Sequence, residues 1–333
     1  MRVSFFLVLL AALCVAGLRE APAAEAKITV LYDAFGKPST LTKDWGFAAL
    51  IEYGGKRILF DTGNDADVLA HNVKELDVDL SRLDFAVISH RHGDHVGGLT
   101  YLLSANPDVQ IFAPREGFGV FGAELPRSFL PANAALPPDM RYWDGAPAER
   151  LHFGSAWPQG NFTLVGETTE VAPGFHVVAL KGEWGTDLPL VELSLLIETP
   201  DGIVVVAGCS HPTIERIVAA AKNAVAKPIH LVIGGMHLIP APPVEIERIA
   251  LALRDEWQVR WLAPAHCTGE PAFERLRDTF GDHFVYAGLG TTVPLAAEPL
   301  AHHSSDSSHA FAHASAGREY RSPNSLASGH PTH

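Results

Sequence analysis

One short stretch, SHRHGDHVGG at residues 89–98, constrains this chain more than any other feature. Within six residues it holds three histidines and one aspartate: His90, His92, Asp94 and His95. It follows an apolar run, Phe85–Ile88, that is typical of a buried strand. Neutral imidazole and carboxylate are good ligands for zinc, iron or manganese. The stretch therefore predicts a metal-binding loop rooted at the end of a strand.

The spacing of these residues allows one loop to serve two metal ions. His90 and His92 project from the same side of an extended segment, because alternate side chains of such a segment share a side. A turn after His92 then lets Asp94 and His95 face a second point nearby. We therefore expect this loop to supply two ligands to each of two ions, with the strand holding its root in place.

The same stretch resembles the His-x-His-x-Asp-His signature of the metallo-β-lactamase superfamily, and ILFDTG at residues 58–63 resembles the first motif of that superfamily. Three later stretches resemble a subgroup named after a dihydropterin–ribofuranosylaminobenzene 5'-phosphate synthase: VVVAGCSHPTIERIV, HLVIGGMHLI and LAPAHCTGEPAFERL. The resemblance covers roughly residues 31–289. It implies an α/β fold, the four-layer αβ/βα metallo-β-lactamase sandwich, with a metal site along one edge of the sheets.

The resemblance also implies a set of metal ligands. The site would hold two divalent ions, with zinc expected and iron or manganese as the alternatives. His90 and His92 would bind the first ion, and Asp94, His95 and His266 the second.

The third ligand of the first ion is open between two residues. Many superfamily members carry a further histidine after the signature loop, but only His152 and His176 fall between that loop and Cys209, and neither lies in a recognisable ligand turn. Cys209 stands near the place of the superfamily's bridging aspartate, and His211 follows two residues later. We expect His211 to complete the shell, with the Cys209 thiolate as an alternative or bridging ligand.

Other residues near the motifs have expected roles beside the ions. The superfamily resemblance also implies that Asp61 would orient the signature loop from behind the ligands. Asp94 is expected to accept a hydrogen bond from the attacking nucleophile. His237, which follows a strand and two glycines, is expected to contact substrate or shuttle a proton, with a structural role as the alternative. Cys267 comes directly after His266, so we expect its side chain to point away from the metal and pack.

Such a centre favours metal-assisted hydrolysis of an ester, lactone, amide or phosphoester in a small-molecule substrate. The subgroup's name implies an alternative, a transfer that joins a pterin diphosphate to an aniline-type acceptor. A mononuclear-iron redox enzyme on the same fold is a further alternative. Diiron oxidoreductases of the superfamily typically carry glutamate where this chain has His92, so the histidine favours hydrolysis. Retention of the whole ligand set argues against a non-catalytic binder.

The N-terminus has the pattern of a signal peptide, residues 1–26. Arg2 precedes the apolar run SFFLVLLAALCVAGL, and cleavage is expected after Ala23 or Ala26. This pattern predicts a periplasmic or secreted protein with no stable membrane association after cleavage; an uncleaved anchor is the alternative. It also disfavours the pterin transfer, because pterin biosynthesis needs cytoplasmic substrates.

Strand and helix patterns alternate in both halves of the segment 27–296, which predicts one α/β domain. Residues 106–175 are rich in proline, glycine and aromatics, and we interpret them as a substrate-shaping insertion. Residues 297–333 are rich in histidine and serine and predict a disordered tail. With 25 basic and 38 acidic residues among 333, the net charge of −13 argues against binding to nucleic acid. No pattern indicates an oligomeric state.

Overall fold

The computed structural model describes residues 26–116, 120–130, 132–153, 155–182 and 190–295. The predicted signal peptide (except Ala26) and the predicted tail, 297–333, lie outside the described residues. Within those ranges, no helix is both long and apolar enough to cross a membrane.

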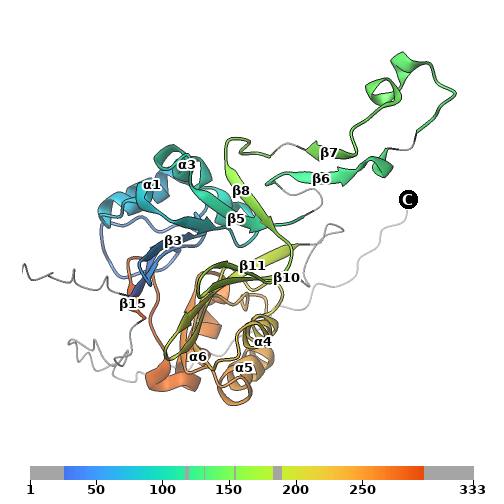
Figure 1. Cartoon of the computed structure of the whole chain (residues 1–333). Coiled ribbons are helices and arrows are strands. Elements are labelled where there is room, and N and C mark those ends of the chain that lie inside the picture. The colour runs from blue at the N-terminus through green and yellow to red at the C-terminus, as the bar shows by residue number, and fades with distance from the viewer. Residues whose placement is uncertain (1–25, 117–119, 131, 154, 183–189, 296–333) are drawn as a thin grey trace, which may run out of the picture. The chain divides into compact units, whose positions relative to one another are not determined.

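Two mixed sheets contain most of the described strands (Figure 1). In spatial order, the first sheet consists of β15 (Thr292–Pro294), β1 (Lys27–Tyr32), β2 (Ala48–Tyr53), β3 (Lys56–Phe60), β4 (Phe85–Val87), β5 (Gln110–Pro114) and β8 (Asn161–Val165). The second consists of β14 (Trp261–Ala265), β13 (Ile229–Gly235), β12 (Gly202–Ala207), β11 (Val191–Thr199), β10 (Phe175–Lys181) and β9 (Thr169–Ala172). Strands β3, β4, β5 and β8 run parallel, as do β12, β13 and β14. The other neighbouring pairs in the two sheets are antiparallel.

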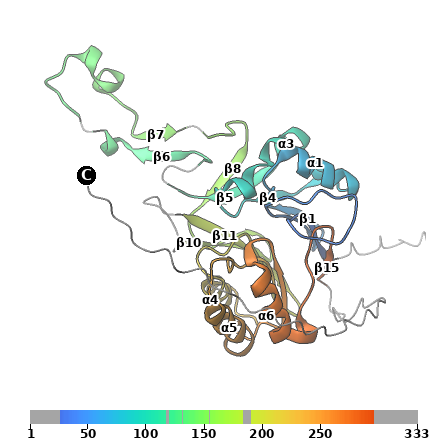
Figure 2. The same cartoon turned by 180° about the vertical axis from the view of Figure 1, so that it is seen from behind.

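Helices cover one face of each sheet. Against the first sheet lie α1 (Ala66–Glu75) and α3 (Leu99–Ala105), with the short α2 (Gly93–Val96) before α3. Against the second lie α4 (Ile214–Ala224), α5 (Pro243–Leu251) and α6 (Glu270–Phe280), as both views show (Figures 1 and 2). Short helical turns lie at Leu80–Arg82, Arg127–Phe129, Pro138–Met140, Tyr142–Gly145, Ala252–Glu256, His266–Thr268 and Gly281–His283.

The strands divide their side chains between cores because successive residues point to opposite faces of a sheet. In β3, Ile58 and Phe60 face the core between the two sheets, whereas Leu59 packs with α1 and α3. In β12, Val204 faces the core between the sheets and Val205 packs with α4, α5 and α6. The order is therefore helices, sheet, sheet, helices, which confirms the predicted four-layer αβ/βα sandwich.

The segment 106–175 is more regular than its composition predicts. Its strands β5 and β8 extend the first sheet, and β9 extends the second. Among the described strands of this segment, only the hairpin of β6 (Ala123–Pro126) and β7 (Arg150–Phe153) pairs with neither main sheet. The predicted insertion is thus narrower than 106–175, because both of its ends are strands whose edges pair with sheet neighbours.

Two glycines at the end of the signature stretch allow the chain to pass close to the loop after β3. Gly97 donates its backbone N–H to the carbonyl of Gly63 at 2.9 Å, and a Cβ added at Gly97 would overlap the backbone of Asn64. Thr62 donates its N–H to the carbonyl of His95 at 2.9 Å. The signature loop is thereby attached to the loop that carries Asp61.

We expect Gly97→Ala to lower the free energy of unfolding by about 1–3 kcal/mol, because the added methyl group has no room beside Asn64. Thermal unfolding measures this, as a fall in melting temperature of several degrees. Gly93→Ala is the matched control, since a Cβ there meets no atom within 4 Å. Equal melting temperatures for the two variants would contradict the prediction.

Candidate metal centre

The predicted site residues come from the carboxyl ends of strands in both sheets. In the first sheet, Asp61 follows β3 and the signature loop follows β4. In the second, Cys209 and His211 follow β12, His237 follows β13 and His266 follows β14. Parallel strands end at the same edge of a sheet, which is where open α/β sheets place their ligands. The topology therefore brings together residues that lie up to 205 positions apart, from Asp61 to His266.

Buried hydrogen bonds orient the signature loop. Asp61 accepts the backbone N–H of Ser89 at 2.6 Å, the Ser89 hydroxyl at 2.7 Å and Nδ1–H of His95 at 2.7 Å. Since the Ser89 hydroxyl donates to Asp61, its oxygen can accept Nδ1–H of His90, which lies 2.9 Å away. In the neutral form of both rings, Nδ1 thus carries the proton and Nε2 carries the lone pair with which imidazole binds metals.

Two sets of three ligand atoms lie side by side in the centre, and within each set the atoms lie within 4.8 Å of one another. One set belongs to His90, His92 and His211, and the other to Asp94, His95 and His266. In the first set, Nε2 of His90 lies 3.0 Å from Nδ1 of His92. In the second, Oδ2 of Asp94 lies 3.4 Å from Nε2 of His266 and 3.8 Å from Nε2 of His95.

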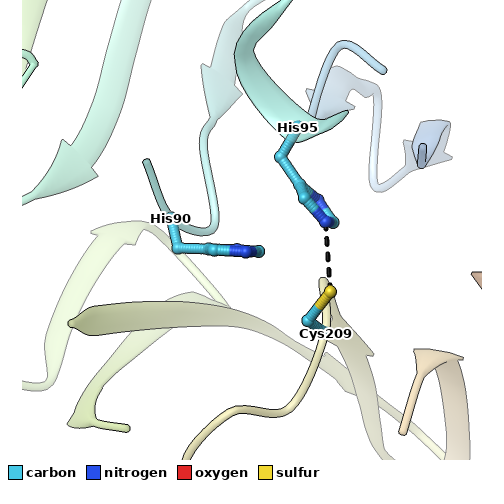
Figure 3. A group of neighbouring side chains, drawn as sticks. All are labelled: His90, His95 and Cys209. Carbon is cyan, nitrogen blue, oxygen red and sulfur yellow. Dashed lines mark hydrogen bonds between the residues drawn. The ribbon is translucent and has the colours of Figure 1, made fainter. Parts of the chain in front are cut away.

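Cys209 lies between the two sets. Its sulfur is 3.2 Å from Nε2 of His95, and it forms a further group with His90 and His95 (Figure 3). In this view the two histidines approach from the first sheet and the cysteine from the second. The same sulfur also groups with His211 and His237. Cys209 is therefore placed where a thiolate could reach either ion.

The donors fit a metal ion. Both ring nitrogens of His211 and both of His266 are buried without a hydrogen-bond partner within the described part of the protein. Buried polar atoms without partners are unfavourable, and an ion is a partner that imidazole binds well. Burial lowers the pKa of His90 and lowers that of His211 to about 3, which keeps both rings neutral and able to coordinate.

His95 differs in its electrostatics. Burial opposes its charged form, but the neighbouring Asp61 carboxylate outweighs this and raises the pKa of His95 to about 9. A carboxylate behind a ligating histidine increases the basicity of the ring toward a proton or a metal ion.

Two expectations about individual residues have clear outcomes. Cys267 does not point away, since its sulfur lies within 4.8 Å of the ligand atoms of Cys209 and His266. The expected strand-like alternation fails because His266 has a left-handed backbone, with φ of 46°, and starts a tight turn. His176 lies in β10 and bonds Glu198 at 2.8 Å, as expected for a packed histidine, and His152 lies in β7.

Three residues beside the centre were not singled out from the sequence. Glu192 and Asp33 are buried carboxylates, and burial raises their pKa values to about 7 and about 8. A lone acidic residue within or just after an apolar strand is a usable signal, because carboxylates are seldom fully buried without a partner. Trp45 is 45% exposed and its ring lies 4.9 Å from that of His266. Nothing in the sequence around Trp45 marks it.

Comparison with known proteins agrees with this fold and this histidine-rich edge. The profile of the metallo-beta-lactamase superfamily matches residues 45–266, and the chain belongs to this superfamily. Within it, the chain is 32% identical to the 7,8-dihydropterin-6-methyl-4-(beta-D-ribofuranosyl)-aminobenzene-5'-phosphate synthase of Methanocaldococcus jannaschii, over 80% of this chain and 95% of that protein. An uncharacterised protein of the same organism is 27% identical over 75% of this chain and 93% of its own length.

Among solved structures, the chain is similar to Tm1679, described as a metal-dependent hydrolase of the beta-lactamase superfamily. The TM-score is 0.62 at 25% identity, and the match covers 81% of this chain and 99% of that one. The expected superfamily and the resemblance to the synthase subgroup are both confirmed.

Proposed function

We propose that this protein is a metal-dependent hydrolase whose two ions are held by His90, His92 and His211 and by Asp94, His95 and His266. The observation that carries the proposal is the pair of compact donor sets, one beside the other, at the joint edge of the two sheets. Unpartnered imidazole nitrogens in each set support it. When bound, two divalent ions would polarise the substrate oxygen and lower the pKa of a water molecule.

Asp94 is proposed to accept a hydrogen bond from the attacking nucleophile. It is half-buried, and although this burial opposes ionisation, the imidazoles of His266 and His95 hold the pKa of Asp94 well below its ordinary value. An ionised carboxylate at this place accepts a hydrogen bond and fixes the direction of the attacking oxygen. His237, whose ring lies 4.4 Å from that of His211, is proposed to exchange a proton with substrate.

The open side of the centre gives the proposed direction of substrate approach. His92 is exposed, whereas His90 and His95 are fully buried. The exposed ring of Trp45 beside His266 offers an apolar wall. We propose a small molecule with an ester, lactone, amide or phosphoester bond as the substrate. The leader-like N-terminus supports a periplasmic or secreted location as part of the proposal.

Pterin transfer is the second candidate function. The similarity to the synthase of Methanocaldococcus jannaschii over 80% of this chain favours it. The same donor sets would serve that reaction, so the centre alone does not separate the two activities.

Metal analysis of the purified protein, together with a panel of ester, lactone, amide and phosphoester substrates, tests the proposal. We expect about two divalent ions per chain and hydrolysis that chelation removes and added zinc restores. A metal-loaded protein that is inert on the panel, yet joins a pterin diphosphate to an aniline acceptor, would establish the synthase activity instead.

A further inference from the structure

We propose that two buried carboxylates, Glu192 and Asp33, act as separate positioning residues for the two ion positions. Glu192 would hold the loop that carries Cys209 and His211, and Asp33 the turn that begins at His266. The inference rests on the proposed metal centre, since it assigns the control of each ion position to a different residue.

Glu192 lies near the start of β11 and is 1% exposed. Its Oε1 accepts the backbone N–H of Cys209 at 2.9 Å and that of Ser210 at 2.7 Å. Its Oε2 accepts the N–H of His211 at 2.7 Å. Three consecutive backbone donors thus converge on one carboxylate, which fixes residues 209–211 in the segment between β12 and α4.

Asp33 directly follows β1 and is fully buried. Its Oδ2 accepts the backbone N–H of His266 at 2.9 Å, and its Oδ1 accepts that of Ala34 at 2.7 Å. Asp33 belongs to the first sheet and His266 follows a strand of the second. This carboxylate therefore holds a ligand turn from across the interface between the sheets.

Backbone strain explains why these two segments need such support. Ser210, between Cys209 and His211, has φ of 66°, and His266 has φ of 46°. Residues other than glycine are unfavourable in this left-handed region and remain there only when their surroundings hold them. In each segment the buried carboxylate accepts the N–H of the strained residue itself.

The two carboxylates reach different ion positions. Glu192 bonds the backbone of His211, whose imidazole belongs to the set with His90 and His92. Asp33 bonds the backbone of His266, whose imidazole belongs to the set with Asp94 and His95. A general role in folding would affect both positions alike, whereas a positioning role predicts that each carboxylate affects one.

Glu192→Gln and Asp33→Asn test this separation. Both oxygens of Glu192 accept backbone N–H groups. In Glu192→Gln, either orientation of the amide therefore places its NH2 group against at least one backbone N–H donor. Amide hydrogen exchange in the metal-free proteins is the first measurement. We expect exchange at Cys209, Ser210 and His211 to be about tenfold faster or more in Glu192→Gln, with His266 unchanged. Asp33→Asn should show the reverse. Glu198→Gln on the same strand, where the carboxylate bonds His176 and Lys227 near the surface, is the matched control.

Zinc affinity, measured by competition with a chromophoric chelator, is the second measurement. In a His266→Ala background, where the His211 position remains, Glu192→Gln should weaken binding about 10–100-fold. In a His211→Ala background, the same change should have a much smaller effect, limited to what Cys209 contributes to the second ion position. Asp33→Asn should weaken binding in that background by the full factor.

Unchanged exchange in both carboxylate variants would overturn the inference, and so would equal losses of affinity at both ion positions. If Glu192→Gln does not fold, Glu192→Asp takes its place, because it keeps the charge but withdraws the carboxylate by one methylene. A wild-type protein that binds none of zinc, iron and manganese would overturn the proposed function, and the exchange measurements would still decide whether Glu192 and Asp33 hold their segments.

Discussion

His211→Ala is expected to lower the metal content of the purified protein from about two ions per chain toward one. Three protein ligands and a water are the usual shell of a catalytic zinc ion, and without His211 one donor set retains only His90 and His92. The fold should survive, since the removed imidazole makes no hydrogen bond within the described residues and the backbone N–H to Glu192 remains. Metal stoichiometry measures the loss, with circular dichroism as the folding measurement.

Cys209→Ser distinguishes the imidazole from the thiolate as the ligand. We expect a smaller loss of metal than in His211→Ala, because a serine oxygen or a water beside it partly replaces a bridging sulfur. His176→Ala is the control for loss of a histidine, since His176 bonds Glu198 away from the centre. Full metal in His211→Ala together with loss in Cys209→Ser would identify the thiolate as the third ligand.

His92→Ala should have the largest effect on activity. Mutations behind metal ligands commonly lower metal affinity or activity about 10–100-fold, and removal of a direct ligand is expected to exceed that range. His92 is exposed, so its truncation leaves no buried cavity and the melting temperature should change little. The measurements are kcat/KM on the best substrate of the panel and thermal unfolding of the same samples.

His71→Ala is the matched control for His92→Ala. His71 is also an exposed histidine, and its ring bonds only the carbonyl of Thr40 among the contacts described. It should retain wild-type activity. Wild-type turnover in His92→Ala would exclude this histidine from the centre and leave the proposed first ion position without a sufficient set of donors.

Much of the fold can be predicted from the sequence, because the spacing of apolar residues indicates which face of each helix or strand is buried. IVVV in β12 and LVI in β13 are continuous apolar runs, as expected for parallel strands that are covered on both faces. The helical spacing of IERIVAAAKNA predicts α4, whose buried residues include Ile217 and Val218. Strands β5 and β8 could not be predicted from the sequence of 106–175. Short strands between irregular segments contain too few residues to show an alternation of apolar and polar side chains.

The signature loop is also determined locally. His90, His92, Asp94 and His95 are close in sequence, and the strand before them and the glycines after them set the turn. Their ability to bind metal therefore follows from residue type and spacing alone, whereas the expected link to Asp61 came from the superfamily resemblance. His211 lies close to His90 and His92 in the structure. That His211, rather than a residue of the insertion, is the third ligand stays a prediction, which came from the superfamily resemblance and not from spacing.

Only the tertiary structure decided how the second sheet contributes to the centre. Cys209, Cys267 and His266 meet because β12, β13 and β14 end at one edge, and that edge packs against the corresponding edge of the first sheet. Left-handed backbones at Ser210 and His266 then set side-chain directions that strand alternation cannot predict. The sequence determined which donors exist and the loop that holds four of them. The directions of the remaining donors depend on the long-range pairing of strands and on the buried carboxylates that hold the strained turns. Those contacts join residues that are far apart in the sequence, so no local pattern predicts them.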